Sequence, residues 1–150
     1  MNVLKPDFDS YKLIAIHTKL EDYKLAYLIN SALGSGLKRH KESLDFKNSG
    51  ASFSVFEHLD KQTLFNQHLI QNKVLHQSED PDQGSFFKEF FKKTHCLVNE
   101  KKEVDFFLRV EDCDEKYLSK VIGVLKMLEG IIFSYSLQIS GLKSRNNLIF

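Results

Sequence analysis

The sequence lacks the features that would take it outside the class of ordinary globular proteins. Among 150 residues it has two cysteines, two prolines and no tryptophan, so neither a disulfide framework nor a proline-rich linker is expected. Basic and acidic residues nearly cancel, and the formal net charge of +1 provides no strong field to attract nucleic acid. We therefore expect no nucleic-acid partner.

Long apolar stretches are absent too. The longest runs, such as residues 13–16, fall far short of the roughly 20 residues that a membrane-spanning helix requires. The N-terminus opens no apolar signal-peptide core, and Cys96 and Cys113 form no CxxC pair, so both thiols are expected to be reduced. These absences predict a single cytoplasmic domain over residues 1–150, without a membrane partner.

The usual signatures of cofactor and metal sites are also missing. The six histidines are scattered and form no HxH or HExxH motif or zinc-like Cys/His spacing. There is no P-loop, no GxGxxG loop and no GxSxG elbow. His95 and Cys96 are adjacent on an expected strand and would point to opposite faces, which disfavours a catalytic pair. We therefore expect no metal and no cofactor.

The first part of the chain changes from strand to helix periodicity. Residues 11–17 hold a short continuous apolar run, which is typical of a strand that is covered on both faces. From Glu21 onward, apolar residues recur at helical spacing. The helix is expected to end at Gly34, because glycine readily adopts the left-handed conformation that helix ends require.

The middle of the chain is expected to be a β-meander. Residues 37–46 and 51–57 predict a hairpin around a turn at residues 47–50. Residues 63–74 predict a third strand, whose length indicates a bulge or bend. A polar loop follows, and then four phenylalanines within residues 86–91, which we expect to anchor that loop to the core. Left exposed, this cluster would instead form a partner surface.

The last third repeats the strand–helix–strand order. Residues 104–110 alternate in the manner of a strand, Asp114 opens a helix that is expected to continue to Gly130, and residues 131–139 alternate again. Gly123 lies inside the expected helix, where glycine costs about 1 kcal/mol relative to alanine. Its presence indicates a close approach to a neighbouring element.

Together these patterns predict an α+β two-layer sandwich. Two βαβ units surround the meander, and crossover handedness places both helices on one face of a largely antiparallel sheet, in a loosely ferredoxin-like arrangement. The other face is expected to stay open. Since apolar residues of 104–110 point toward the helices, Asp105, Phe107 and Arg109 are expected on the open face.

The stretch V-N-E-K-K-E-V-D-F at residues 98–106 resembles the I-P-E-x-x-x-V-D-Y signature that names a bacterial protein family. The identical positions are Glu100, Val104 and Asp105. Val98 and Phe106 replace Ile and Tyr, whereas Asn99 replaces Pro and removes the fixed φ that would stiffen the turn. The resemblance extends over nearly the whole chain. It implies a bacterial, cytoplasmic protein, and it supplies no activity.

Three hypotheses for function follow. The first is a non-enzymatic protein-interaction or regulatory module, whose open face with Asp105, Phe107 and Arg109 meets a protein partner or a second copy. The alternative is a small hydrolase or lyase that uses Glu100 and Asp105 as a carboxylate pair, which requires a concave site that holds both within about 5 to 10 Å. A third hypothesis, small-ligand sensing, depends on analogy with βαββαβ regulatory domains.

Overall fold

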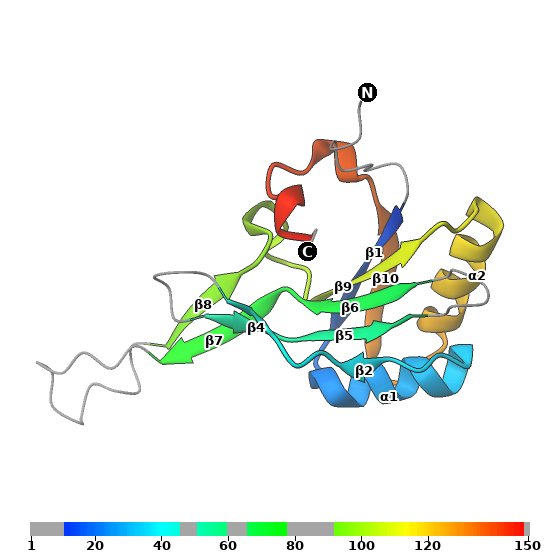
Figure 1. Ribbon diagram of the computed structural model, residues 1–150, viewed down its shortest axis with the longest axis horizontal. Coiled ribbons are helices and arrows are strands. Elements are labelled where there is room, and N and C mark those ends of the chain that lie inside the picture. Colours follow the sequence, from blue (N-terminus) through cyan, green and yellow to red (C-terminus); the bar gives the residue numbers. More distant parts are fainter. Residues whose placement is uncertain (1–10, 46–50, 60–65, 78–91, 149–150) are drawn as a thin grey trace, which may run out of the picture.

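The strands and helices follow the two periodicities of the sequence. The computed structural model in Figure 1 describes residues 11–45, 51–59, 66–77 and 92–148. Its strands are β1 (Tyr11–Thr18), β2 (Lys38–Arg39), β3 (Leu44–Asp45), β4 (Ser52–Phe53), β5 (Val55–His58), β6 (Gln67–Gln71), β7 (Lys73–Gln77), β8 (Lys92–Cys96), β9 (Phe106–Glu111) and β10 (Ile131–Leu137). Its helices are α1 (Asp22–Leu33) and α2 (Glu115–Lys126), with short 3-10 turns η2 (Asn99–Lys101), η3 (Ile139–Gly141) and η4 (Arg145–Leu148). The predicted turn at residues 47–50 and the phenylalanines of residues 86–91 lie outside the described residues.

Six of these strands form one antiparallel sheet in the order β10-β1-β9-β6-β5-β2. β9 and β10 both pair with β1 in antiparallel fashion, so they run parallel to each other with α2 as their crossover. β1 and β2 also run parallel, with three strands between them, and α1 connects them. The prediction of a two-layer α+β sandwich built from two βαβ units around a meander is confirmed.

Two of the helix boundaries coincide with the capping residues that the sequence provides. Asp114 precedes α2, and its side chain accepts a hydrogen bond of 2.7 Å from the backbone N–H of Tyr117, which satisfies a free donor of the first turn. α1 ends at Gly34, whose φ of 67° lies in the left-handed region. α2 ends at Lys126 rather than at the predicted Gly130, and a short turn separates it from β10.

The strands in the middle of the chain are shorter and more often interrupted than those of a simple meander. The predicted hairpin is interrupted, because β2 pairs with β5 whereas β3 pairs with β4 in a separate ribbon. The expected third strand bends at Asn72, which divides it into β6 of the large sheet and β7 of a two-stranded arm with β8. Figure 1 shows this arm projecting from the body. The predicted bend in residues 63–74 is thus located at Asn72.

Both helices cover one face of the sheet. Their fully or nearly buried residues are spaced at helical intervals and are Leu25, Ala26, Ile29, Leu118, Val121 and Leu125. They pack against alternate residues of the central strands, among them Ile14, Ile16 and Leu108. Burial of one such side chain contributes about 1.5 to 3 kcal/mol, so this packing determines on which side of the sheet the helices lie.

The opposite face is also covered over the central strands, contrary to prediction. The cover comes from segments without regular periodicity: the β3–β4 ribbon, the turn between β8 and β9, and the C-terminal η3 and η4. Their buried apolar residues include Phe53, Leu97, Val98, Leu142 and Leu148. Figure 1 shows α1 and the red C-terminal segment on opposite sides of the strands. The prediction of an open face is therefore wrong for the centre of the sheet.

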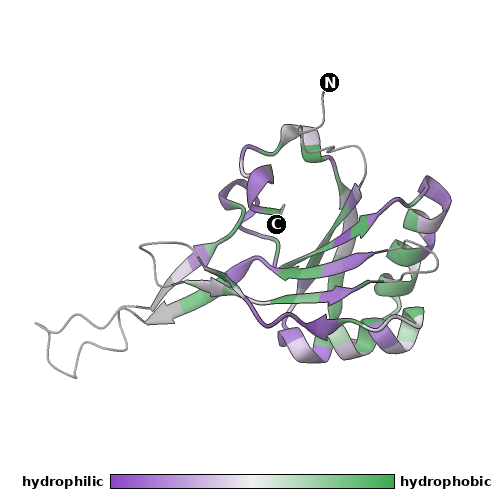
Figure 2. Cartoon of the chain, in the orientation of Figure 1, coloured by the Kyte–Doolittle hydropathy of each residue, from purple (hydrophilic) through white to green (hydrophobic). Residues whose placement is uncertain are grey.

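The two edges of the sheet differ in length and polarity. β2 contributes only Lys38 and Arg39, which are both exposed, and it is coloured hydrophilic in Figure 2. β10 contributes the seven residues Ile131–Leu137, none of which is charged. Short, charged edges resist pairing with further strands, whereas long uncharged edges permit it. The β10 edge is therefore the one suited to pairing.

The predicted close approach at Gly123 is wrong. The residue is exposed, and a Cβ atom built on it would meet no atom of a neighbouring element within 4 Å. Gly123 therefore weakens α2 without a packing reason.

Gly123→Ala is expected to raise the free energy of unfolding by about 0.5 to 1 kcal/mol, because alanine favours the helix and restricts the unfolded chain. Chemical denaturation followed by circular dichroism measures the change. The control, Gly34→Ala, is expected to lower stability, since a side chain is strained at a φ of 67°. A Gly123→Ala variant that is no more stable than the wild type would contradict the prediction.

Candidate functional site

The segment that resembles the family signature forms a tight turn between the arm and the central strand β9. The fully buried side chain of Asn72 holds this turn. Its Nδ2 donates to the carbonyl oxygens of Lys101 and Val104 at 2.9 and 2.8 Å. Its Oδ1 accepts from the backbone N–H of Val98 at 2.8 Å. A single amide thus satisfies three backbone groups of the turn, which would otherwise be costly to bury.

Glu100, the first candidate carboxylate, binds the C-terminal segment. Its Oε1 accepts from the backbone N–H of Ser144 at 2.6 Å, and its Oε2 accepts from the Ser144 hydroxyl at 2.8 Å. Slight burial acts to raise the pKa of Glu100, but hydrogen bonds from Ser144 and from the backbone of Glu100 and Lys143 together outweigh it and leave the pKa below its ordinary value. Glu100 is therefore ionised at neutral pH and anchors this segment, a state unsuited to a general acid.

Asp105, the second candidate carboxylate, holds the end of β1. Its Oδ2 accepts from the backbone N–H of Thr18 at 2.9 Å, and its Oδ1 lies 3.3 Å from Nζ of Lys73. Asp105 lines a hollow of about 320 Å³ beside the start of α1, and Glu100 does not belong to the lining. The two carboxylates thus serve different junctions, and the hollow beside Asp105 is not shared with Glu100.

Phe107 and Arg109 lie on the predicted face of the sheet, but neither is accessible. Phe107 is 0% exposed and Arg109 is 5% exposed. Phe107 lies between Ala15 of β1 and Ile70 of β6, and it belongs to the apolar cluster that includes C-terminal Leu148. The expectation that Phe107 and Arg109 form an open contact surface is wrong, because the irregular segments cover this part of the sheet.

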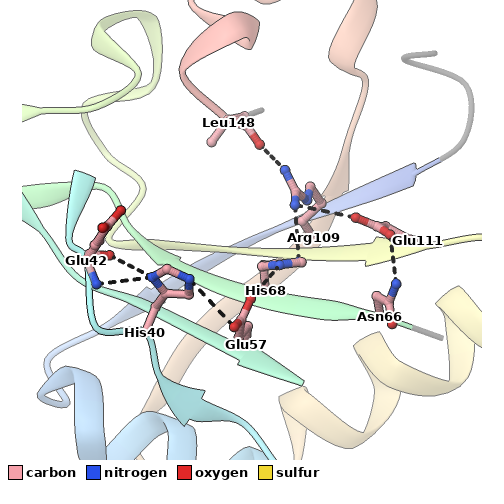
Figure 3. A network of polar contacts seen from close by, with 8 residues as sticks. All are labelled: His40, Glu42, Glu57, Asn66, His68, Arg109, Glu111 and Leu148. Carbon is pink, nitrogen blue, oxygen red and sulfur yellow. Dashed lines mark hydrogen bonds and ion pairs between the residues drawn. The ribbon is translucent and has the colours of Figure 1, made fainter. Parts of the chain in front are cut away.

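Arg109 belongs to a row of polar side chains that crosses neighbouring strands (Figure 3). His68 on β6 is registered opposite Arg109, and Glu57 on β5 is registered opposite His68. Nη2 of Arg109 lies 3.1 Å from Nδ1 of His68, and Nε2 of His68 lies 3.5 Å from a carboxylate oxygen of Glu57. The other oxygen of Glu57 lies 3.7 Å from Nε2 of His40. The row therefore links the centre of the sheet to its β2 edge.

The same guanidinium fastens the C-terminal segment to the sheet. Nη1 of Arg109 donates to the carbonyl oxygen of Leu148, and Nη2 lies 3.4 Å from Oε1 of Glu111. The guanidinium carbon lies 5.6 Å from the ring centre of Tyr11. Burial lowers the pKa of Arg109 and the Glu111 carboxylate offsets part of this effect; the guanidinium still remains charged in the physiological range. Arg109 therefore acts as a structural cation.

His68 is neutral at physiological pH. Burial and the Arg109 guanidinium lower its pKa from 6.5 to about 4, although the Glu57 carboxylate acts in the opposite direction. Since a guanidinium can only donate, Nδ1 of His68 accepts from Arg109 and the proton resides on Nε2, facing Glu57. Both ring nitrogens are engaged within the fold, so this histidine is not placed to exchange a proton with a substrate.

An open part of the same face remains beside β10, and sequence reasoning missed it. Phe133 is 63% exposed and Tyr135 is 37% exposed. They lie opposite His17 and Ala15 of β1, on the face away from the helices. Nε2 of His17 lies 2.8 Å from the Tyr135 hydroxyl, and its ring meets Phe133 edge-on with centroids 5.8 Å apart. These contacts hold the exposed aromatic rings in place.

The signal that would have identified this surface is the complete lack of charge in β10. The segment reads I-I-F-S-Y-S-L, and the alternating apolar residues of 131–139 predict a strand without indicating which of its side chains stay exposed. Ile132, on the other side of the strand, is 54% exposed as well. Exposed apolar residues on both sides of an edge strand distinguish β10 from a core strand.

Neither thiol is activated. Burial is the largest influence on Cys96 and Cys113 and raises the pKa of both, which disfavours the nucleophilic thiolate. Within the described ranges, no three His, Cys, Asp or Glu side chains gather where a metal ion would bind. Of the helices in the described residues, none is long and apolar enough to cross a bilayer.

Comparisons with protein-family models, with curated proteins and with solved structures found no match to this chain. Membership of the family with the I-P-E-x-x-x-V-D-Y signature therefore stays a prediction.

Asn72→Ala is expected to lower the free energy of unfolding by about 2 to 4 kcal/mol, because it leaves buried backbone groups of the turn without partners. Urea denaturation measures the loss. The control is Asn146→Ala, at an exposed asparagine of the C-terminal segment, and it is expected to change stability by less than about 0.5 kcal/mol. Equal stabilities of the two variants would argue against the role of Asn72.

Stability is expected to fall as the pH drops from about 6.5 to about 4, by an amount on the order of 3 kcal/mol from His68. The unfolded chain protonates His68 through its ordinary pKa, whereas the folded chain resists protonation until the lowered pKa is reached. Urea denaturation across this range tests the slope. His68→Gln should flatten it relative to the wild type, while His40→Gln should retain it; identical slopes for wild type and His68→Gln would refute the assignment.

Proposed function

We propose that this protein is a non-enzymatic protein-interaction module that binds its partner through β10. The contact surface consists of the outer backbone edge of β10 and the exposed side chains of Ile132, Phe133 and Tyr135. We call it the β10 surface. The observation that carries the proposal is an uncharged, seven-residue edge strand with exposed aromatic rings, to which no described strand adds on the outer side.

An edge strand of this kind has free backbone donors and acceptors that match those of another extended chain. Proteins commonly protect such edges with short length, charge, proline or bulges, and β2 at the other edge of the sheet is both short and charged. β10 has no charge and no proline, and the irregularity in its pairing with β1 lies at its start, beside Ile132. Its backbone can therefore supply affinity by strand addition, while Phe133 and Tyr135 supply apolar contact area.

The chemistry-bearing side chains favour binding over catalysis. Glu100 is engaged by Ser144, and Asp105 by Thr18 and Lys73, at separate junctions of the fold. His68 has both ring nitrogens engaged within the polar row. Groups that hold a fold together in this way are unavailable for proton transfer to a substrate.

Small-ligand sensing is a second candidate, supported by one observation. A surface hollow of about 790 Å³ lies at the β2–β5 edge, and Lys38, His40, Lys41 and His58 line it. Glu42 and Glu57 line the same hollow, so its charge is mixed. It has no exposed aromatic platform comparable with Phe133 and Tyr135, and we therefore rank it below the β10 surface.

The double variant Phe133→Lys/Tyr135→Lys is expected to lose a partner that the wild type retains in affinity purification from its own cells. Both residues are exposed, so the fold should survive. The matched control is Tyr23→Lys/Tyr27→Lys, which changes two exposed aromatic residues of α1 instead. Quantitative mass spectrometry should show one or more proteins depleted by about tenfold or more with the β10 variant alone. The same proteins at equal abundance with all three baits would refute the proposal.

A further inference from the structure

We infer that the partner of the β10 surface is a second copy of this chain, bound edge to edge and antiparallel about a two-fold axis at Ser134. This inference rests on the proposed function, and it specifies the occupant and the register. Addition of β10 to β10 would join two six-stranded sheets into one continuous sheet.

The sequence of β10 is self-complementary about its midpoint. With Ser134 on the axis, Phe133 of one copy faces Tyr135 of the second copy, and this aromatic pair occurs twice. The match is confined to the centre of the strand, because the pairing of β10 with β1 shifts register between Phe133 and Ile131. Because β10 has no charged residue, self-pairing brings no like charges opposite each other, which would otherwise oppose it.

The face on which these residues lie also fits the two-fold arrangement. Antiparallel edge pairing about an axis perpendicular to the sheet leaves equivalent faces on the same side. Phe133 and Tyr135 lie on the face away from the helices, so all four rings of the dimer would gather there. Each pair would cover aromatic surface that is exposed in the single chain, where His17 already orders it.

The other edge of the sheet favours a closed dimer over a growing fibre. A head-to-tail array would pair β10 with β2, which offers only Lys38 and Arg39. Two charged residues provide neither the length nor the apolar side chains that match β10. Pairing of β10 with itself uses up both long edges, so association stops at two copies.

The expected dimer is reversible. A seven-residue strand pair with the neighbouring side chains buries on the order of 1,000 Å² in total, at the lower limit of specific interfaces. Interfaces of this size dissociate readily, so the fraction of dimer should rise with protein concentration in the micromolar range.

Sedimentation velocity of the purified full chain, from about 1 μM to about 1 mM, tests the inference directly. The wild type and the control Tyr23→Lys/Tyr27→Lys should shift from monomer to dimer over this range. Phe133→Lys/Tyr135→Lys should stay monomeric, with a dissociation constant raised by about tenfold or more, because lysines then face each other across the axis. Circular dichroism establishes that the variant is folded.

Charge complementation tests the register. Phe133→Lys mixed with Tyr135→Glu should form a mixed dimer, since position 133 of one copy faces position 135 of the other. Phe133→Lys mixed with Phe133→Glu should gain less, because each new charge then faces a tyrosine. Equal association of the two mixtures would exclude the proposed register.

A wild type that stays monomeric at about 1 mM, or a dimer that survives Phe133→Lys/Tyr135→Lys, would overturn the inference. These outcomes are distinguishable from failure of the proposed function. If the wild type is monomeric but a cellular partner is still lost with the β10 variant, β10 binds a different protein and only the second copy is excluded. If no partner and no dimer depend on β10, both proposals fail.

Discussion

The hydrogen bonds of the buried Asn72 side chain are the interaction on which the cover over the sheet face away from the helices depends. A chain that bends out of a sheet leaves backbone groups without partners, and their burial is costly. Here one amide satisfies three such groups in the turn between the arm and β9. The chain can therefore leave the sheet after β6 and return in β9, with Leu97 and Val98 placed over the face away from the helices.

The polar residues near this turn also attach the covering segments to the sheet. Glu100 holds the C-terminal segment through Ser144, and Arg109 holds it through the carbonyl oxygen of Leu148. Asp105 ties the turn to the end of β1. Glu100 and Asp105, which match the family signature, thus connect segments that are distant in the sequence. The segments held in this way cover the centre of the sheet face away from the helices. The exposed residues of that face therefore include Phe133 and Tyr135 of β10.

Periodicity predicted much of the fold because it reports which side of each element is apolar. The burial of Leu25 and Leu118 against the sheet follows from it. The end of α1 at Gly34 and the start of α2 after Asp114 follow instead from the capping preferences of glycine and aspartate. The candidate site was less predictable. Phe107 is covered by single apolar residues of irregular segments. Because these residues do not recur at a regular spacing, the sequence gives no pattern from which their burial could be predicted.

By itself the sequence determined the α+β class, both helices and the side of the sheet that they cover, since these follow from local hydrophobic spacing. Only the tertiary structure decided which residues of the other face stay accessible. Phe107 and Phe133 both belong to strands with alternating apolar residues, yet Phe107 is buried and Phe133 is exposed. The difference arises because segments distant in sequence meet over Phe107 and leave Phe133 exposed. Local hydrophobic spacing does not predict such long-range contacts.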